Sequence, residues 1–258
     1  MPLLGLGVYG MQSQEAEMAV LHALEIGYRL IDTAAMYGNE PEIGRAIKQS
    51  PIDRADIFLV TKLNNTEHGF EKAQKAFDRS LKALQMDYID LYLIHWPIKK
   101  GRKESWQALE KLYRDKRVRA IGVANYNLPL LKELEEYATV NPMVNQIEFS
   151  PWLYQKDVLQ YGNTHKIQIQ AYSPITRGLR FDDPRLISLT HKYQKTAAQL
   201  VLRWHLEHGI SPIPKSSKKQ RLQENFEANF FHLEPADILL MDDFDEGFRI
   251  CDNPADYQ

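Results

Sequence analysis

The sequence predicts an α/β fold: a closed (β/α)8 TIM barrel of eight parallel strands, formed by a single domain over residues 1–258. Eight short apolar runs alternate with longer stretches of helical periodicity. Most of the runs begin about 25 to 35 residues apart, which is the length of one strand–helix unit. Eight such units in one chain of this length favour a closed barrel over an open sheet.

The expected strands are mostly continuous apolar runs, as parallel strands covered on both faces should be. They occupy residues 3–9, 28–33, 57–62, 89–95, 118–123, 143–149, 167–172 and 210–214. No linker, low-complexity stretch or charge block divides them. We therefore expect one barrel and no second domain.

Helical periodicity fills the intervals between the expected strands. Apolar residues from Ala16 to Leu24 form one stripe at 3.6-residue spacing. Asp183 and Pro184 are typical of an N-cap and a first helical position. Further helices are expected at residues 73–84, 106–112, 197–206, 218–228 and 235–241.

Composition limits the function classes. A formal net charge of −2 gives no electrostatic reason to expect nucleic acid or an acidic membrane as partner. Cys251 is the only cysteine, so no internal disulfide can form and a reducing compartment is favoured. No apolar run approaches the roughly 20 residues of a membrane span, and the N-terminus lacks the features of a signal peptide. We expect a cytoplasmic, monomeric enzyme without a metal.

The segment GLGVYG, with Gly5, Gly7 and Gly10, matches a dinucleotide-binding fingerprint, and Asp32 follows at a suitable distance. That fingerprint requires a strand before its first glycine, and only four residues precede Gly5. We therefore interpret the glycines as punctuation of the first barrel strand.

Three successive strand ends carry ionisable side chains. Asp32 and Tyr37 lie in IDTAAMYGNE, Lys62 in FLVTKL and His95 in LYLIHWP. Asp32, Lys62 and His95 are separated by 30 and 33 residues, one strand–helix unit each. Because the carboxyl ends of barrel strands share one rim, the four side chains should meet there.

These four residue types together suit the reduction of a carbonyl. A lysine cation beside a tyrosine should lower the pKa of the phenol, and an aspartate should hold the lysine in place. A neutral histidine can orient a substrate oxygen. Singly, His95 fits a structural histidine, Asp32 and Lys62 a strand-end ion pair, and Tyr37 an aromatic at a helix start. Their order and spacing favour the functional interpretation.

Several motifs together resemble the aldo-keto reductases, especially small prokaryotic-type members that reduce keto sugars and short aldehydes, such as diketogluconate and aldehyde reductases. They are DTAAMYGNE, VTKL, LYLIHWP, VRAIGVANY, VNQIEFSP, AYSP and IPKSSKKQRLQEN. The resemblance runs from Met1 to about Asp245. It implies that Asp32, Tyr37, Lys62 and His95 form a catalytic tetrad. Hydride would come from NADPH, and Tyr37 would protonate the nascent alkoxide.

The segment IPKSSKK joins the eighth strand to a helix, where barrels commonly bind phosphate. Four cationic side chains there suit a phosphate monoester: Lys215, Lys218, Lys219 and Arg221. Without the other motifs, a solvated basic helix start would explain them equally well.

The resemblance also implies the cofactor contacts. Lys215, Ser216 and Arg221 would meet the 2′-phosphate of NADP, and Glu224 and Asn225 the adenine. Asn125 and Gln146 would hold the carboxamide, Tyr172 would stack on the nicotinamide, and Ser173 would begin the loop over the pyrophosphate.

Tyr9, Trp96 and Met36 are expected to wall the substrate pocket. The sequence departs from the family in having Ala124 where a serine is usual, and in starting directly at strand one without a preceding hairpin. The short C-terminal segment, residues 249–258, suggests that a substrate-specificity loop from that end is minimal. Two alternatives stay open: an NADPH-binding sensor or scaffold barrel with negligible turnover, and a phosphate-binding isomerase.

Overall fold

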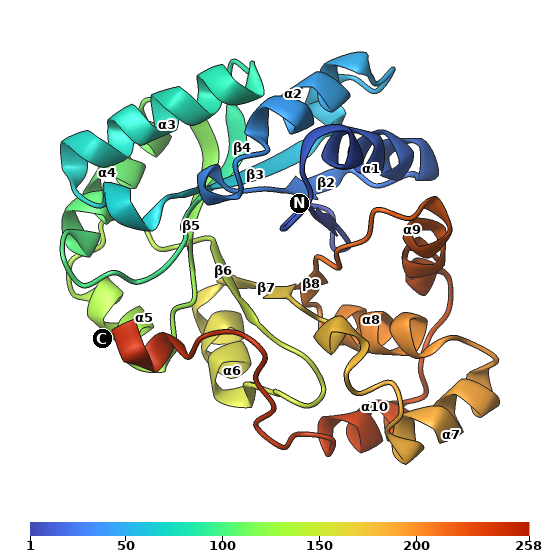
Figure 1. Ribbon diagram of the computed structural model, residues 1–258. Coiled ribbons are helices and arrows are strands. Elements are labelled where there is room, and N and C mark those ends of the chain that lie inside the picture. Colours follow the sequence, from blue (N-terminus) through green and yellow to red (C-terminus); the bar gives the residue numbers. More distant parts are fainter. Residues whose placement is uncertain (258) are drawn as a thin grey trace.

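The computed structural model describes residues 1–257 and contains one eight-stranded sheet in which sequential strands are neighbours and all pairs are parallel. Helices surround these strands (Figure 1). The strands are β1 (Leu6–Gly7), β2 (Leu30–Asp32), β3 (Phe58–Leu63), β4 (Ile89–Ile94), β5 (Val118–Ala124), β6 (Val144–Glu148), β7 (Gln168–Tyr172) and β8 (Ser211–Pro212). The barrel expected from the sequence is confirmed.

Contacts between β1 and the segment after β8 close the barrel. Gly5 N–H donates to Pro212 O at 3.0 Å, and Gly7 N–H donates to Pro214 O at 3.2 Å. A Cβ on Gly7 would lie 2.8 Å from Ile213 O, so the close approach requires glycine. GLGVYG therefore belongs to the barrel seam, as the sequence interpretation expected.

β1 and β8 are each only two residues long, shorter than the runs 3–9 and 210–214. The prolines at 212 and 214 have no N–H to donate, which limits regular pairing at this seam. No hairpin is present in the described residues that precede β1.

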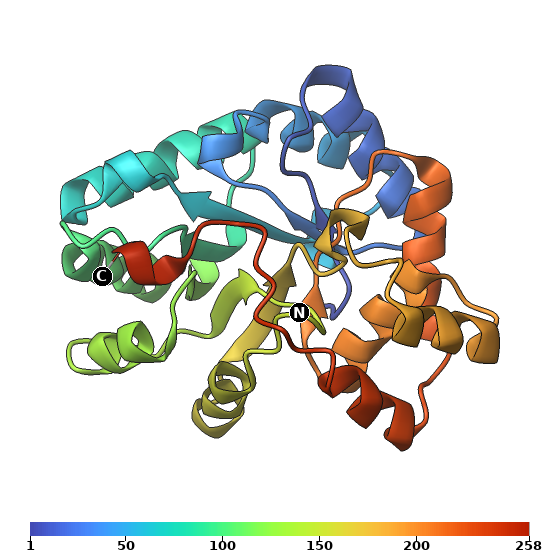
Figure 2. The same cartoon turned by 60° about the horizontal axis from the view of Figure 1, so that its bottom comes forward.

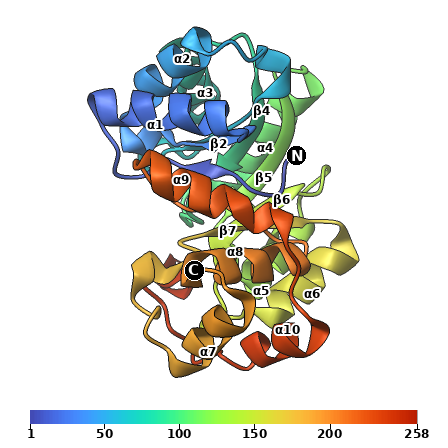
Figure 3. The ribbon, with the colours of Figure 1, turned by 90° about the vertical axis from the view of Figure 1, so that its right-hand side faces the viewer.

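The described residues form ten α-helices, which include every helix that the sequence predicted. They are α1 (Ser13–Ile26), α2 (Glu40–Gln49), α3 (Phe70–Leu84), α4 (Arg102–Arg114), α5 (Leu128–Glu135), α6 (Lys156–His165), α7 (Pro184–Tyr193), α8 (Ala197–Glu207), α9 (Lys219–Phe226) and α10 (Pro235–Asp242). Asp183 caps α7 by accepting from Arg185 N–H. Helix α9, which lies between β8 and α10 in the sequence, packs beside α1 (Figure 3).

Alternate residues of β3 face opposite sides of the sheet. Leu59 and Leu63 pack into the large apolar cluster that includes the buried helix residues, whereas Val60 belongs to a smaller separate cluster. Lys62 shares the parity of Val60 and so faces the barrel interior, and Thr61 faces the helices. Because Lys62 is also the next-to-last residue of β3, its side chain lies near the carboxyl end of the barrel interior.

The described residues contain neither a membrane-spanning helix nor a cluster of metal-binding side chains. No helix among residues 1–257 is long and apolar enough to cross a membrane. Within the same range, no group of three or more His, Cys, Asp or Glu side chains is arranged to hold a metal ion.

Candidate active site

A buried ion pair lies at the centre of the predicted site. Lys62 Nζ donates to Asp32 Oδ1 at 2.6 Å and to the carbonyl oxygen of Thr33 at 2.8 Å. The side chains of Lys62 and Asp32 are 0% and 3% exposed. Gln146 Nε2 donates to the other carboxylate oxygen of Asp32 at 2.7 Å. The hydrogen bonds fix both charged groups at the ends of adjacent strands.

Tyr37 lies over this pair, in the short 3-10 helix Ala35–Tyr37 that follows β2. Lys62 Nζ is 5.1 Å from the centroid of the Tyr37 ring. The His95 ring, directly after β4, lies edge-on to it with a centroid separation of 5.6 Å. The structure thus brings together all four residues of the predicted tetrad.

The pKa of Tyr37 contradicts one sequence expectation. Burial raises it well above the usual value for a tyrosine, and the carboxylate of Asp32 raises it further. The pKa of Tyr37 therefore does not fall below its usual value as expected, because burial and the negative charge of Asp32 together outweigh the stabilisation of the phenolate by Lys62. Tyr37 keeps its proton at neutral pH.

His95 is uncharged for a related reason. Burial lowers its pKa well below the usual value for histidine, and the positive charge of Lys62 lowers it further. Its Nδ1 is buried and has no hydrogen-bond partner among residues 1–257. The direction of this pKa shift agrees with the neutral imidazole expected from the sequence.

Asn125 and Gln146 connect this site to Tyr172. Asn125 Nδ2 donates to the His95 carbonyl at 2.9 Å, and Asn125 Oδ1 accepts from the Tyr172 hydroxyl at 2.8 Å. The Asn125 backbone has a φ of +66°, a left-handed conformation that asparagine tolerates better than most residues. Its N–H donates to Gln146 O at 2.8 Å. Asn125, directly after β5, thus joins the central residue of β6 to the last residue of β7.

The basic segment after β8 lies at the start of α9. Lys215, Lys218 and Arg221 are exposed, and no carboxylate partner is recorded for them within the described chain. Lys219 differs, because its Nζ forms an ion pair with Glu25 of α1 at 2.7 Å. Three of the four expected cations are therefore available to an anion. Unpaired cations beside a helix N-terminus suit a phosphate.

The other residues expected at the cofactor lie close to this segment or to β7. The buried Ser216 hydroxyl accepts from Lys218 N–H at 3.3 Å. Glu224 Oε1 accepts from the Thr196 hydroxyl at 2.7 Å, and Asn225 is buried. Ser173 follows β7 with a φ of +49°. Glu224 is thus already hydrogen-bonded within the protein.

Comparisons with known proteins identify the family of this chain. The sequence pattern of the aldo/keto reductase family matches residues 3–246. The chain belongs to this family. It is 44% identical over 255 residues to a glyoxal reductase of Bacillus subtilis (strain 168), covering 98% of this chain and 92% of that one. Similarity at this level over nearly the whole chain identifies an oxidoreductase.

Solved structures agree with this assignment of the aldo/keto reductase fold. A family member from a Medee basin deep-sea metagenome library superposes with a TM-score of 0.96 at 41% identity, covering 98% of this chain and 94% of that one. A Bombyx mori aldo-keto reductase in complex with NADP gives a TM-score of 0.91 at 34% identity, covering 98% and 92%.

The residues expected to form the substrate pocket differ in their contacts and in their exposure. Tyr9 packs its ring 5.1 Å from that of Tyr37 and remains 62% exposed. Met36 precedes Tyr37 and is 43% exposed. Trp96 is half-buried and contacts the ring of Tyr257 at 4.8 Å.

The C-terminal segment of this aldo/keto reductase lies across the barrel rim. Figure 2 shows it running from α10 across the strands. Glu148, at the end of β6, accepts from Ile250 N–H at 2.7 Å and from Cys251 N–H at 3.2 Å. Tyr257 then reaches Trp96. The segment is short, as the sequence indicated, and the buried carboxylate of Glu148 fastens it to the barrel rim.

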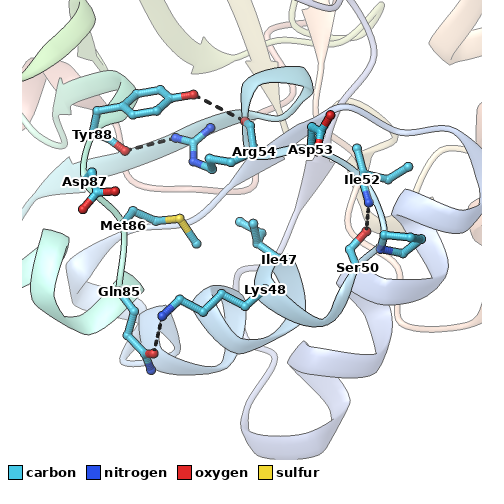
Figure 4. A pocket seen from close by; sticks show the side chains of 11 residues that line it. Ile47, Lys48, Ser50, Ile52, Asp53, Arg54, Gln85, Met86, Asp87 and Tyr88 are labelled. Carbon is cyan, nitrogen blue, oxygen red and sulfur yellow. Dashed lines mark hydrogen bonds between the residues drawn. The ribbon is translucent and has the colours of Figure 1, made fainter.

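A separate hollow of about 330 Å³ lies at the opposite end of the barrel (Figure 4). It lies between the end of α2 and the segments that precede β3 and β4. The Arg54 guanidinium donates to Tyr88 O at 3.0 Å and to buried Asp90 at 2.7 Å. In barrels, residues at this end contribute to stability and chemistry occurs at the other end.

Sequence reasoning missed several polar residues that support the site. Gln170 accepts from Gln146 Nε2 at 2.6 Å, and Asn39 accepts from the Thr33 hydroxyl at 2.7 Å. Both side chains are buried. Polar residues inside or beside an apolar strand were the available signal, because a buried polar group needs a partner.

Proposed function

We propose that this protein reduces aldehyde or ketone carbonyls to alcohols with NADPH, with Tyr37 as the proton donor. The observation that carries the proposal is the Asp32–Lys62 ion pair beneath the Tyr37 ring and beside neutral His95. NADPH would supply the hydride. We place the protein in the cytoplasm and propose that residues 1–258 form one domain.

Each residue of the tetrad has a distinct role in this proposal. Tyr37 carries its proton at neutral pH because burial raises its pKa. Lys62 lies on the face of the ring, where its charge stabilises the phenolate left after proton transfer. Asp32 holds the ammonium in place. The single proton of neutral His95 is assigned to Nε2, since Nδ1 has no acceptor among residues 1–257, and it can orient the substrate oxygen.

The residues fit NADPH by the chemistry of their donors. Lys215 and Arg221 suit the 2′-phosphate as cations beside the start of α9. Both hydrogens of the Gln146 amide are used by Asp32 and Gln170, so its oxygen is the group that would accept from a carboxamide. Tyr172 would supply the stacking surface. The Bombyx mori relative, solved with NADP, supports this choice of cofactor.

The experiment measures NADPH oxidation with glyoxal, methylglyoxal, short aldehydes and keto sugars. The wild type should turn over at least one of these, and Tyr37→Phe should lower kcat by about 10²- to 10⁴-fold, the usual contribution of a general acid. NADPH binding, followed by fluorescence quenching, should change less than about twofold because the ring remains.

Three outcomes distinguish the proposals. Undiminished turnover by Tyr37→Phe removes Tyr37 as proton donor. Tight NADPH binding without turnover on any substrate identifies the sensor or scaffold alternative. An absence of NADPH binding excludes both and favours the phosphate-binding isomerase.

A further inference from the structure

The loop that carries Tyr37 is held at both ends by side chains. It runs from Thr33, after β2, to Asn39, before α2, and contains a single turn of 3-10 helix. This turn has no side-chain cap, and it ends at Gly38 with a φ of +69°. A short loop of this kind depends on its anchors for a fixed geometry, and Tyr37 is in the middle of it.

The first anchor begins at Lys62, whose side chain faces the barrel interior. Lys62 Nζ donates to the Thr33 carbonyl at 2.8 Å, and the Thr33 hydroxyl donates to Asn39 Oδ1 at 2.7 Å. Asn39 Nδ2 then donates to the carbonyls of Val8 and Met11, both at 3.0 Å. Asn39 stands at the N-cap of α2 but its side chain does not cap the helix. An N-cap side chain that would ordinarily stabilise the helix is used here to fasten the loop.

The second anchor lies on the other face of the same strand. Thr61 precedes Lys62 in β3, so its side chain points away from the barrel interior. Its hydroxyl donates to Glu40 Oε1 at 2.7 Å. Glu40 is the first residue of α2 and directly follows the loop. Two consecutive residues of β3 therefore hold the two ends of the segment that carries Tyr37.

Glu40 is an unusual group in this position. It is 6% exposed, and no cationic side chain pairs with it within residues 1–257. Burial raises its pKa, and the hydrogen bond from Thr61 partly opposes that shift. The N-terminus of α2 offers only modest compensation for a negative charge. An apolar side chain would cost less here, so packing alone does not explain a carboxyl group.

We propose that Glu40 and Thr61 are positioning residues, whose hydrogen bond fixes the loop between β2 and α2 so that Tyr37 is aligned with Lys62 and His95. This inference rests on the proposed function, since alignment matters only if Tyr37 transfers a proton. It assigns no direct contact with substrate to either residue.

Three substitutions separate the hydrogen bond from the fold. Thr61→Val keeps the shape and removes the donor, and Glu40→Ala removes the acceptor. Glu40→Gln keeps an acceptor oxygen for Thr61. Its amide can donate to the buried hydroxyl of Ser80, which has no partner among residues 1–257. Ser80 lies near enough to Glu40 to lower the pKa of its carboxyl group. Glu42→Gln is the matched control, because Glu42 lies in the same helical turn and its one ion pair among residues 1–257 is with the partly exposed Arg45.

The kinetic readout is the division between kcat and KM. Thr61→Val and Glu40→Ala should lower kcat by about 10- to 100-fold, as small misplacements of a reacting group do. KM for NADPH should stay within about twofold. The deuterium isotope effect on kcat, with NADPH labelled at the transferred hydrogen, should rise. Glu40→Gln should restore most of the activity, and Glu42→Gln should match the wild type.

Two kinetic results overturn the proposal. The first is a kcat of Thr61→Val equal to that of the wild type, together with an inactive Tyr37→Phe. This pair of results would refute the positioning role and leave the proposed function intact. The second is a loss of activity that Glu40→Gln does not recover, since the charge or the fold would then be responsible. If Glu40→Ala does not fold, Thr61→Val and Glu40→Gln still decide.

A second readout needs no turnover. With 3-fluorotyrosine incorporated, the ¹⁹F resonance absent from Tyr37→Phe identifies position 37. That resonance should shift or broaden in Thr61→Val and match the wild type in Glu40→Gln. An unchanged resonance in Thr61→Val overturns the proposal, even if the wild type proves inactive as a reductase.

Discussion

Lys62 and Asp32 show how one buried contact determines the state of its neighbours. Burial lowers the pKa of Lys62 and raises that of Asp32, and each opposite charge counters the shift of the other. Neither ion would be stable in this position alone. Burial, reinforced by the negative charge of Asp32, raises the pKa of Tyr37 and keeps it protonated, whereas burial and Lys62 together lower the pKa of His95 and keep it neutral.

Removal of only one partner of this ion pair should therefore lower the stability of the protein. Lys62→Met should lower the free energy of unfolding by about 3–5 kcal/mol, because it leaves the Asp32 carboxyl buried without its cation. The double substitution Asp32→Asn with Lys62→Met should recover most of that stability but no activity. Urea denaturation and NADPH oxidation measure the two effects. Equal stability of the single and double variants would contradict this account.

At the scale of elements, the junction of β8 and α9 serves two purposes. Its prolines and the glycines of β1 close the barrel, and the next residues present Lys215, Lys218 and Arg221 around the start of α9. Lys219 is turned to Glu25 of the neighbouring α1. The sequence does not show which of these cations is paired within the protein. The packing of α9 on α1 decides it, because it brings Lys219 to Glu25.

This difference predicts cofactor preference. Arg221→Ala should raise the Kd for NADPH by about 10- to 100-fold and leave that for NADH within about twofold, because a charge-assisted hydrogen bond contributes roughly 1.5–3 kcal/mol. Lys219→Ala, in the same turn but paired with Glu25, is the control and should change neither value. Fluorescence titration measures both. Equal weakening of NADPH and NADH binding by Arg221→Ala would show that the residue does not meet the 2′-phosphate.

At the scale of the whole molecule, buried histidines link stability to pH. His205 of α8 is fully buried, with Nδ1 2.7 Å from Val201 O and Nε2 3.0 Å from Phe149 O. Burial lowers its pKa to about 4, although the two carbonyl contacts oppose the shift. Burial also lowers the pKa of His68 to about 4. Both histidines are thus neutral in the folded protein near neutral pH.

The sign of the pH dependence follows from these values. Between the unfolded pKa, about 6.5, and the folded pKa, about 4, the unfolded chain binds a proton that the folded chain does not. Stability is therefore complete above about pH 6.5 and is lost as the pH falls through this window. From pH 6.5 to pH 5 the contribution of His205 should fall by about 2 kcal/mol.

Urea denaturation at these two pH values tests this contribution. His205→Gln should reduce the loss of stability between them by about that amount, whatever its effect at pH 7. His191→Gln, at an exposed position of α7, is the control and should leave the loss unchanged. The same loss in wild type and His205→Gln would show that His205 does not titrate as described.

The sequence by itself determined the barrel and indicated which four side chains would lie together at its rim. Apolar runs and helical stripes follow from local geometry, so they can be identified without coordinates. Asp32, Lys62 and His95 were found because parallel strands all end at one rim, which turns regular spacing along the chain into proximity.

Only the tertiary structure decided how those groups behave and what holds them. The raised pKa of Tyr37, the pairing of Lys219 with Glu25, the hydrogen bond between Thr61 and Glu40, and the fastening of the C-terminal segment by Glu148 all depend on residues far apart in sequence or on burial. Local periodicity says which face of an element is buried. Which partner a side chain meets there is set by how the elements pack.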